Sequence, residues 1–152
     1  MRVERILIPE PSDSIMSEDS TDDSEKVDWS FQSKIDQDLR ETDLQGANLR
    51  RVILDGSNLQ GSNLAGADLR NASLIGTDLM KCALDGADLR GARMAKAKLN
   101  LSNFQDAKLD GADLRGVRGR YAIWRRANWW DAKMNDDLRE VLKKKWPKPD
   151  SL

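Results

Sequence analysis

Residues 57–76 read SNLQG SNLAG ADLRN ASLIG, a run in which leucine returns at every fifth position. The spacing holds from position 39 to position 134, where the series contains fourteen Leu, two Met, one Phe, two Trp and Gly119. The residue two positions earlier is small in nearly every unit, and the residue two positions later is Gly in nine. A period of five fits neither an amphipathic helix nor a strand. It predicts a coil with a corner every five residues, and four corners give twenty residues per coil.

The units resemble the pentapeptide-repeat family, whose pattern is Ala-Asp/Asn-Leu-x-x. The clearest matches are Ala47-Asn48-Leu49, Ala67-Asp68-Leu69, Ala87-Asp88-Leu89 and Ala112-Asp113-Leu114. The resemblance covers residues 37–136 and implies an all-β solenoid, a right-handed quadrilateral β-helix of about five coils. The handedness comes from the resemblance alone. Residues twenty apart are expected to stack, so that the fifth-position side chains and the small residues form a narrow dry core.

The segments outside the repeat are expected to have different roles. Residues 1–28 carry most of the acidic surplus of the chain and predict a disordered acidic tail. Residues 29–36 are expected to cap the first coil, with Trp29 and Phe31 over its open top. A capping helix is expected at 137–146, followed by a tail at 147–152.

The predicted helix begins after an Asn or Asp cap, has acids in its first turn and lysines in its last, and stops at Pro147. Its apolar face is expected to contain Leu138, Val141, Leu142 and Trp146. The helix would close the core, and the alternative is a dimer contact, since some members of the family associate through their C-terminal ends. The chain is thus expected to be a monomer or a C-terminally mediated dimer.

The residue inventory argues against catalysis. The chain has no His, one Cys and one Tyr, so the usual acid–base and nucleophilic groups are missing, and we expect no enzyme, metal or cofactor. Cys82 falls at an inward small position. Asp68 and Asp88 would stack at a spacing compatible with a glycosidase pair. Arg70 and Arg90 stand two residues after them and favour ionised carboxylates, which predicts a charge ladder instead.

Two surfaces are candidates for interaction. The first is a side face with the ladder Arg50, Arg70, Arg90, Asp68 and Asp88, which is either a solvated face or a strip that meets an acidic partner. The second is a basic and aromatic C-terminal end with Arg118, Arg120, Tyr121, Arg125, Arg126 and Trp130. Nucleic acid is not the expected ligand, because the sequence pI is about 5.6.

The sequence favours a non-catalytic protein-binding or scaffold module in the cytoplasm, away from membranes, with an unknown protein partner. The alternative is a DNA-mimicking inhibitor of, or protector against action on, DNA gyrase or topoisomerase, as in gyrase-interacting members of the family. That mechanism needs dense negative charge, whereas residues 37–136 carry sixteen Lys/Arg against thirteen Asp/Glu.

Overall fold

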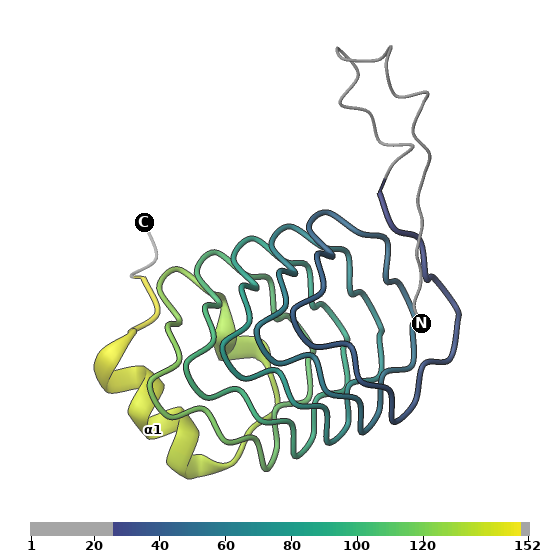
Figure 1. The fold of residues 1–152 in the computed structure, drawn as a ribbon. Coiled ribbons are helices and arrows are strands. Elements are labelled where there is room, and N and C mark those ends of the chain that lie inside the picture. Colours follow the sequence, from purple (N-terminus) through teal and green to yellow (C-terminus); the bar gives the residue numbers. More distant parts are fainter. Residues whose placement is uncertain (1–25, 150–152) are drawn as a thin grey trace, which may run out of the picture.

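The structure is a computed structural model that describes residues 26–149. The chain winds into a stack of four-cornered coils, with the described N-terminal coil at one end and a helix across the other (Figure 1). Isolated parallel bridges pair residues twenty apart, from Asp28 with Asn48 to Asp113 with Lys133. The expected twenty-residue coil is therefore confirmed. Each bridge is a single residue long because the chain turns a corner after it.

The corners share one backbone conformation. Every fifth residue from 31 to 126 has a positive φ, and of these twenty residues nine are Gly and eleven are not. At each regular corner the N–H of the next unit bonds back three residues, as Ala47 N does to Leu44 O at 3.0 Å. A turn of this kind needs a left-handed third residue, which is the position where glycine recurs.

The preference for Asp or Asn before each central leucine also has a local cause. Its Oδ1 accepts the backbone N–H two residues later, as in Asp43 to Gln45 at 3.1 Å and Asn58 to Gln60 at 3.0 Å. That N–H takes no part in the hydrogen bonds between coils. The short polar side chain thus satisfies an otherwise unpaired donor at the corner.

The core consists of the stacked fifth-position side chains and the small residues beside them. Leu44, Leu64 and Leu84 are at most 1% exposed, and Phe104 continues their column at 0%. Trp124 follows and stacks on Phe104, with ring centroids 4.6 Å apart and planes 8° apart. Cys82 is 2% exposed, which confirms its inward position. This arrangement gives a narrow, mainly aliphatic core with few aromatic rings.

The coil conformation begins earlier than residue 37. Asp28 and Ser33 already bridge to the next coil, so residues 29–36, expected as a separate cap, lie within the stack. Trp29 takes a fifth-position place and packs partly buried against the core. The expectation for Phe31 differs from the structure, because Phe31 is a corner residue and is 66% exposed. The expected acidic tail lies largely outside the described residues.

The regular repeat ends at Arg126, and two short helices follow. The 3-10 helix η3 spans Trp129–Asp131 and replaces a corner. The α-helix α1 spans Asp136–Lys145 and lies across the last coil (Figure 1). Leu142 of α1 is fully buried, and Trp129 Nε1 donates to Trp146 O at 2.8 Å. Arg139 Nη2 donates to Ala132 O at 3.0 Å.

Two details of α1 differ from the sequence-based expectation. Val141 is 51% exposed and does not belong to the buried face. Asn135 precedes the helix, but its side chain makes no capping bond. Its Oδ1 instead accepts Gly116 N of the preceding coil at 2.7 Å. The acidic first turn and the lysine-rich last turn are as expected. Within residues 26–149, no helix is long and apolar enough to cross a membrane.

Candidate functional site

The first candidate surface is the face with the Asp–Arg ladder. Arg70 holds Asp68 with two bonds, Nε to Oδ1 at 2.9 Å and Nη2 to Oδ2 at 2.7 Å. Arg90 holds Asp88 in the same way, at 2.8 and 2.5 Å. Neighbouring coils are linked more weakly, with Arg70 Nε 3.9 Å from Asp88 Oδ2. Each pair therefore forms mainly within one repeat unit.

The electrostatics of the ladder keep both carboxylates ionised. The hydrogen bond from Arg70 lowers the pKa of Asp68, and the bond from Arg90 lowers that of Asp88, with partial burial opposing both shifts. Lys108 of the next coil adds to the lowering of the Asp88 pKa. A general acid needs a raised pKa. The pair therefore has the electrostatics of a structural ladder.

The same arrangement recurs away from this face. Asp38 with Arg40 and Asp113 with Arg115 form equivalent two-bond pairs, with shortest ion-pair distances of 2.6 and 2.8 Å. Asp-Leu-Arg is thus a feature of the repeat unit, and its four copies within residues 37–136 could have indicated this. Arg50 is the exception on the ladder, because Asn48 stands where the others have Asp. Among residues 26–149, Arg50 forms no ion pair.

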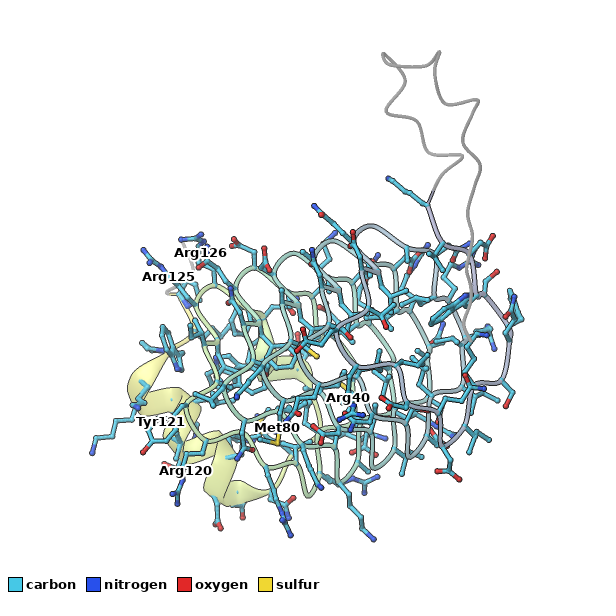
Figure 2. All side chains as sticks on the ribbon, in the orientation of Figure 1. Arg40, Met80, Arg120, Tyr121, Arg125 and Arg126 are labelled. Atoms are coloured by element: carbon cyan, nitrogen blue, oxygen red, sulfur yellow. The ribbon has the colours of Figure 1, made fainter. Side chains whose placement is uncertain are left out.

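The second candidate surface, expected as one basic and aromatic end, is divided in two. Figure 2 shows Arg125 and Arg126 close together and apart from Arg120 and Tyr121. Arg126 pairs with Asp106 of the coil before it, at 2.6 Å. Trp130 lies on the Arg125 side, where Lys148 Nζ stands 5.6 Å from its ring centroid. The split arises because these residues occupy different corners of one coil, although they are near one another in sequence.

The Arg120 side contains a hollow of about 260 Å³ that we call the Gly119 hollow. It lies between the last coil and α1. Its apolar lining is Gly119, Tyr121, Ala122, Trp124, Leu138, Val141, Leu142 and Trp146, and its basic lining is Arg120 and Lys145. The sequence marked Gly119 as the one fifth-position residue without a side chain. It did not show that α1 leaves part of that space open.

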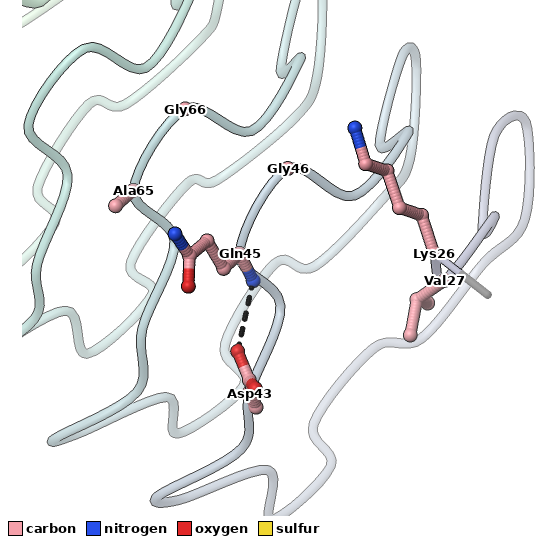
Figure 3. Close-up of a pocket in the computed structure, with 7 residues that line it drawn as sticks. All are labelled: Lys26, Val27, Asp43, Gln45, Gly46, Ala65 and Gly66. Atoms are coloured by element: carbon pink, nitrogen blue, oxygen red, sulfur yellow. Dashed lines mark hydrogen bonds between the residues drawn. The ribbon is translucent and has the colours of Figure 1, made fainter. Parts of the chain in front are cut away.

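Another hollow lies at the other end of the stack (Figure 3). It is lined by Lys26, Val27, Asp43, Gln45, Gly46, Ala65 and Gly66. The Asp43 carboxylate accepts the Gln45 N–H, the same corner bond that other units make. The hollow is therefore a product of small residues on successive corners rather than a set of converging functional groups.

The described residues contain neither a metal-binding cluster nor an accessible thiol. No cluster of three or more Cys, Asp or Glu side chains suited to a metal ion occurs between residues 26 and 149. Burial raises the pKa of the Cys82 thiol to about 12. Its Sγ lies 3.0 Å from Leu59 O, a contact within the core. Cys82 is therefore a packing residue that is kept as a neutral thiol.

Comparison with known proteins identifies the family. The model of pentapeptide repeats matches residues 36–56, 54–84 and 82–118, in eight copies. The chain belongs to the pentapeptide-repeat family. Proteins of this family are generally structural or binding modules. No curated protein matches the chain.

Several solved structures are similar. A pentapeptide repeat protein from the thylakoid lumen of Arabidopsis thaliana is 34% identical, with a TM-score of 0.68 over 71% of this chain and 75% of that one. HetL, involved in heterocyst differentiation regulation in the cyanobacterium Nostoc, is 32% identical, with a TM-score of 0.59 over 62% and 42%. QnrB1, a plasmid-mediated fluoroquinolone resistance protein, is 16% identical with a TM-score of 0.32, too distant to bear on function.

These relatives belong to a family whose fold is the right-handed quadrilateral β-helix. The twenty-residue register and the four corners per coil of this chain agree with that architecture.

Proposed function

We propose that this protein is a non-catalytic module that binds another protein through the surface of its solenoid. The observation that carries the proposal is the separation of charge along the stack. Residues 26–92 contain eight Lys/Arg and ten Asp/Glu, whereas residues 93–149 contain fifteen and seven. A surface polarised in this way steers and orients an acidic partner. The solenoid has about five coils, to which we assign the right-handed course of the family.

The non-catalytic part of the proposal is supported by the state of the carboxylates. Asp68 and Asp88 both accept backbone N–H bonds at their corners, at 3.2 Å each, in addition to their arginine pairs. Groups engaged in this way hold the fold, and their lowered pKa values suit a permanent charge. The cytoplasmic location stays a prediction.

The experiment that tests the proposal is co-purification from cells that express the protein at its native level. In the doubly reversed variant Arg118→Glu/Arg120→Glu, we expect the specifically enriched proteins to be lost. The control Arg50→Glu tests the Asp–Arg ladder without breaking an ion pair and is expected to keep them. If no protein is enriched by the wild type, or if the double reversal retains the same set, the proposal is refuted.

DNA mimicry directed at gyrase or topoisomerase remains the alternative, and the charge distribution does not favour it. Residues 26–149 contain twenty-three Lys/Arg against seventeen Asp/Glu, whereas an imitation of phosphate spacing requires a dense negative surface. We expect the added protein to leave gyrase supercoiling unchanged at micromolar concentration. Inhibition below that concentration would reverse the order of the two functions.

A further inference from the structure

Two exposed apolar residues occupy unfavourable backbone positions near the C-terminal end of the stack, and one of them, Tyr121, lines the Gly119 hollow. Leu101 and Tyr121 stand at the same corner of successive coils, with φ of 63° at both. They are 51% and 72% exposed. A left-handed conformation costs a residue with a Cβ about 1–2 kcal/mol. Elsewhere the repeat places glycine or a polar residue at such corners, apart from Phe31 at the N-terminal end.

Leu101 and Tyr121 thus combine backbone strain with large solvent exposure. Exposed apolar side chains that gather in one place mark interaction surfaces more often than isolated ones do. Val141 of α1, 51% exposed, lines the hollow together with Tyr121. Ile123, two residues further on and 42% exposed, extends the surface onto the adjoining side. Leu101, Tyr121, Ile123 and Val141 are called the apolar patch below.

Gly119 differs from the other glycines of the chain. Its φ lies outside the left-handed region, whereas the nine corner glycines all have positive φ. An added Cβ would meet Trp124 at 3.7 Å, Ala122 at 3.9 Å and Leu99 at 4.0 Å, all ordinary contacts. Neither the backbone nor its immediate neighbours therefore exclude a small side chain here. At Gly119 the chain therefore leaves open an inward space, whereas each of the remaining fifth-position residues fills its space with a side chain.

The borders of the patch are cationic. Arg120 and Lys145 line the hollow, and Lys98 and Arg118 are bridged neighbours in the same outward column. Within the described part of the chain, none of these four forms an ion pair with an acidic side chain. This distinguishes them from Arg70 and Arg90 of the Asp–Arg ladder, which are both paired. Unpaired cations around an apolar hollow complement an acidic ligand that carries an apolar side chain.

We infer that the Gly119 hollow and the apolar patch bind an acidic segment of a partner protein, which seats one bulky apolar side chain in the hollow. The inference rests on the proposed protein-binding function and names its site. The flanking acidic residues of the segment pair with Arg118, Arg120 and Lys145. A second copy of this chain fits less well, because an isologous contact would bring the same cations against each other.

The test uses the full chain and a labelled twelve-residue peptide with six glutamates and one central phenylalanine, observed by fluorescence anisotropy. A twin peptide has serine in place of the phenylalanine. Burial of a phenylalanine side chain predicts binding at least about tenfold tighter for the first peptide. Equal affinity for the two peptides, or no binding of either below millimolar concentration, overturns the inference.

The decisive variant is Leu101→Gly/Tyr121→Gly. Because glycine is favoured at positive φ, the variant is expected to have an unchanged or higher melting temperature. It should nevertheless lose most of the preference for the phenylalanine peptide. A variant that keeps the full preference contradicts the assignment of the apolar patch.

The charges are tested by Arg120→Glu/Lys145→Glu, with Arg50→Glu/Arg51→Glu as the control of equal charge change on another part of the solenoid. The first variant is expected to bind the phenylalanine peptide at least about tenfold more weakly than the wild type at low salt. The control is expected to change the affinity for this peptide less than twofold. Equal losses would show a general charge effect and refute the site.

Other occupants give different outcomes. Tighter binding of a twelve-nucleotide single-stranded DNA than of the phenylalanine peptide would assign the surface to nucleic acid. Self-association that Leu101→Gly/Tyr121→Gly abolishes would assign it to a second copy, and either result overturns the inference. If only the peptide experiments fail while co-purification still depends on Arg118 and Arg120, the proposed function stands. If the peptides behave as expected and nothing co-purifies, the inferred binding site is supported while the proposed function is refuted.

Discussion

At the scale of single residues, the fold depends on a left-handed corner that repeats at every fifth position. Glycine adopts this conformation without a steric penalty, whereas eleven other residues adopt it under strain. The strain is tolerated because backbone hydrogen bonds between coils hold each corner in place. One example is the bond that Gly46 N donates to Ala65 O at 2.9 Å. Each corner therefore has its own small energetic contribution, and the individual contributions can be measured.

Replacement of corner glycines by alanine separates conformational strain from crowding. At Gly66, with φ +66°, an added Cβ meets nothing within 4 Å, so Gly66→Ala is expected to cost only the backbone term, about 1 kcal/mol. At Gly56 the Cβ would overlap the Asp36 carboxylate, which would have to move, so Gly56→Ala is expected to cost more. Chemical denaturation of the two variants provides the comparison. Equal losses would contradict the role given to Asp36.

Two buried hydroxyls, one at each site, bridge two irregular corners near the N-terminal end. The usual turn bonds from Gln37 N to Lys34 O and from Thr42 N to Leu39 O do not occur among the backbone bonds of the described residues. Ser57 Oγ accepts Gln37 N at 2.9 Å and donates to Lys34 O. Ser62 links the second corner in the same way, through Thr42 N and Leu39 O. The polar residues of these inward columns thus have a structural use.

Removal of the Ser57 hydroxyl should show this directly. Ser57→Ala leaves two backbone groups without their link and is expected to lower the free energy of unfolding by about 1–3 kcal/mol. Thr77→Val is the matched control. Leu54 O accepts the Thr77 hydroxyl at 2.8 Å and also Ser57 N at 3.0 Å, so this carbonyl keeps a hydrogen bond when the hydroxyl is removed. The control is expected to cost less than about 1 kcal/mol. Thermal and urea unfolding measure both, and the reverse order would refute the bridging role.

At the scale of elements, α1 closes the open end of the core through a single buried leucine. Leu142 is 0% exposed, whereas Leu138 is only partly buried. Helix packing is reinforced by Arg139, which reaches the carbonyl groups at the end of the last coil. An uncovered coil would leave its apolar core and backbone edge to solvent.

The contribution of α1 to the stability of the fold can be tested by substitutions at two neighbouring positions of the helix, one buried and one exposed. Leu142→Ala is expected to lower the free energy of unfolding by about 2–4 kcal/mol, because it creates a cavity beneath the helix. Val141→Ala, on the exposed side, is expected to change it by less than about 0.5 kcal/mol. Denaturation monitored by tryptophan fluorescence reports both, since Trp129 contacts the helix region. Similar effects of the two variants would show that α1 does not cover the core in solution.

At the scale of the whole molecule, stability is tied to the ionised aspartates. Hydrogen bonds lower the pKa of six carboxyl groups, chiefly through Arg side chains and, at Asp28, through Ser30; these groups are Asp28, Asp38, Asp68, Asp88, Asp106 and Asp113. The pKa of Asp38 falls to about 2. A carboxyl with a lowered folded-state pKa contributes stability above its unfolded value of 3.8, and loses it as the pH falls through the folded value.

The free energy of unfolding is therefore expected to be nearly constant above about pH 5 and to fall between about pH 4 and pH 2. Asp88→Asn should reduce this acid dependence and lower stability near neutral pH by about 0.5–1 kcal/mol. An asparagine retains the corner acceptor, as Asn48 does at the equivalent position, so the variant removes the charge alone. Urea unfolding across this pH range gives the measurement. A stability that rises toward pH 2 would contradict the direction of these pKa shifts.

The sequence determined the repeat, because inward and outward positions alternate in a local five-residue pattern that is independent of distant contacts. It also placed Cys82 and the leucine columns correctly in the core. It misplaced the start of the stack, since Trp29 and Lys34 take fifth-position places without matching the pattern. It also placed Val141 on the buried face of the helix, where the structure leaves it exposed.

The tertiary structure decided which groups meet across coils and at the C-terminal end. Stacking at a twenty-residue interval puts Leu101 beside Tyr121 and separates Arg120 from Arg125, which are close in sequence. Only the docking of α1 creates the hollow over Gly119, because the helix covers one part of the last coil and leaves another part open. The five-residue pattern contains no information about how α1 lies on the last coil, because that placement depends on the packing of Leu142 and Trp146 against the coil.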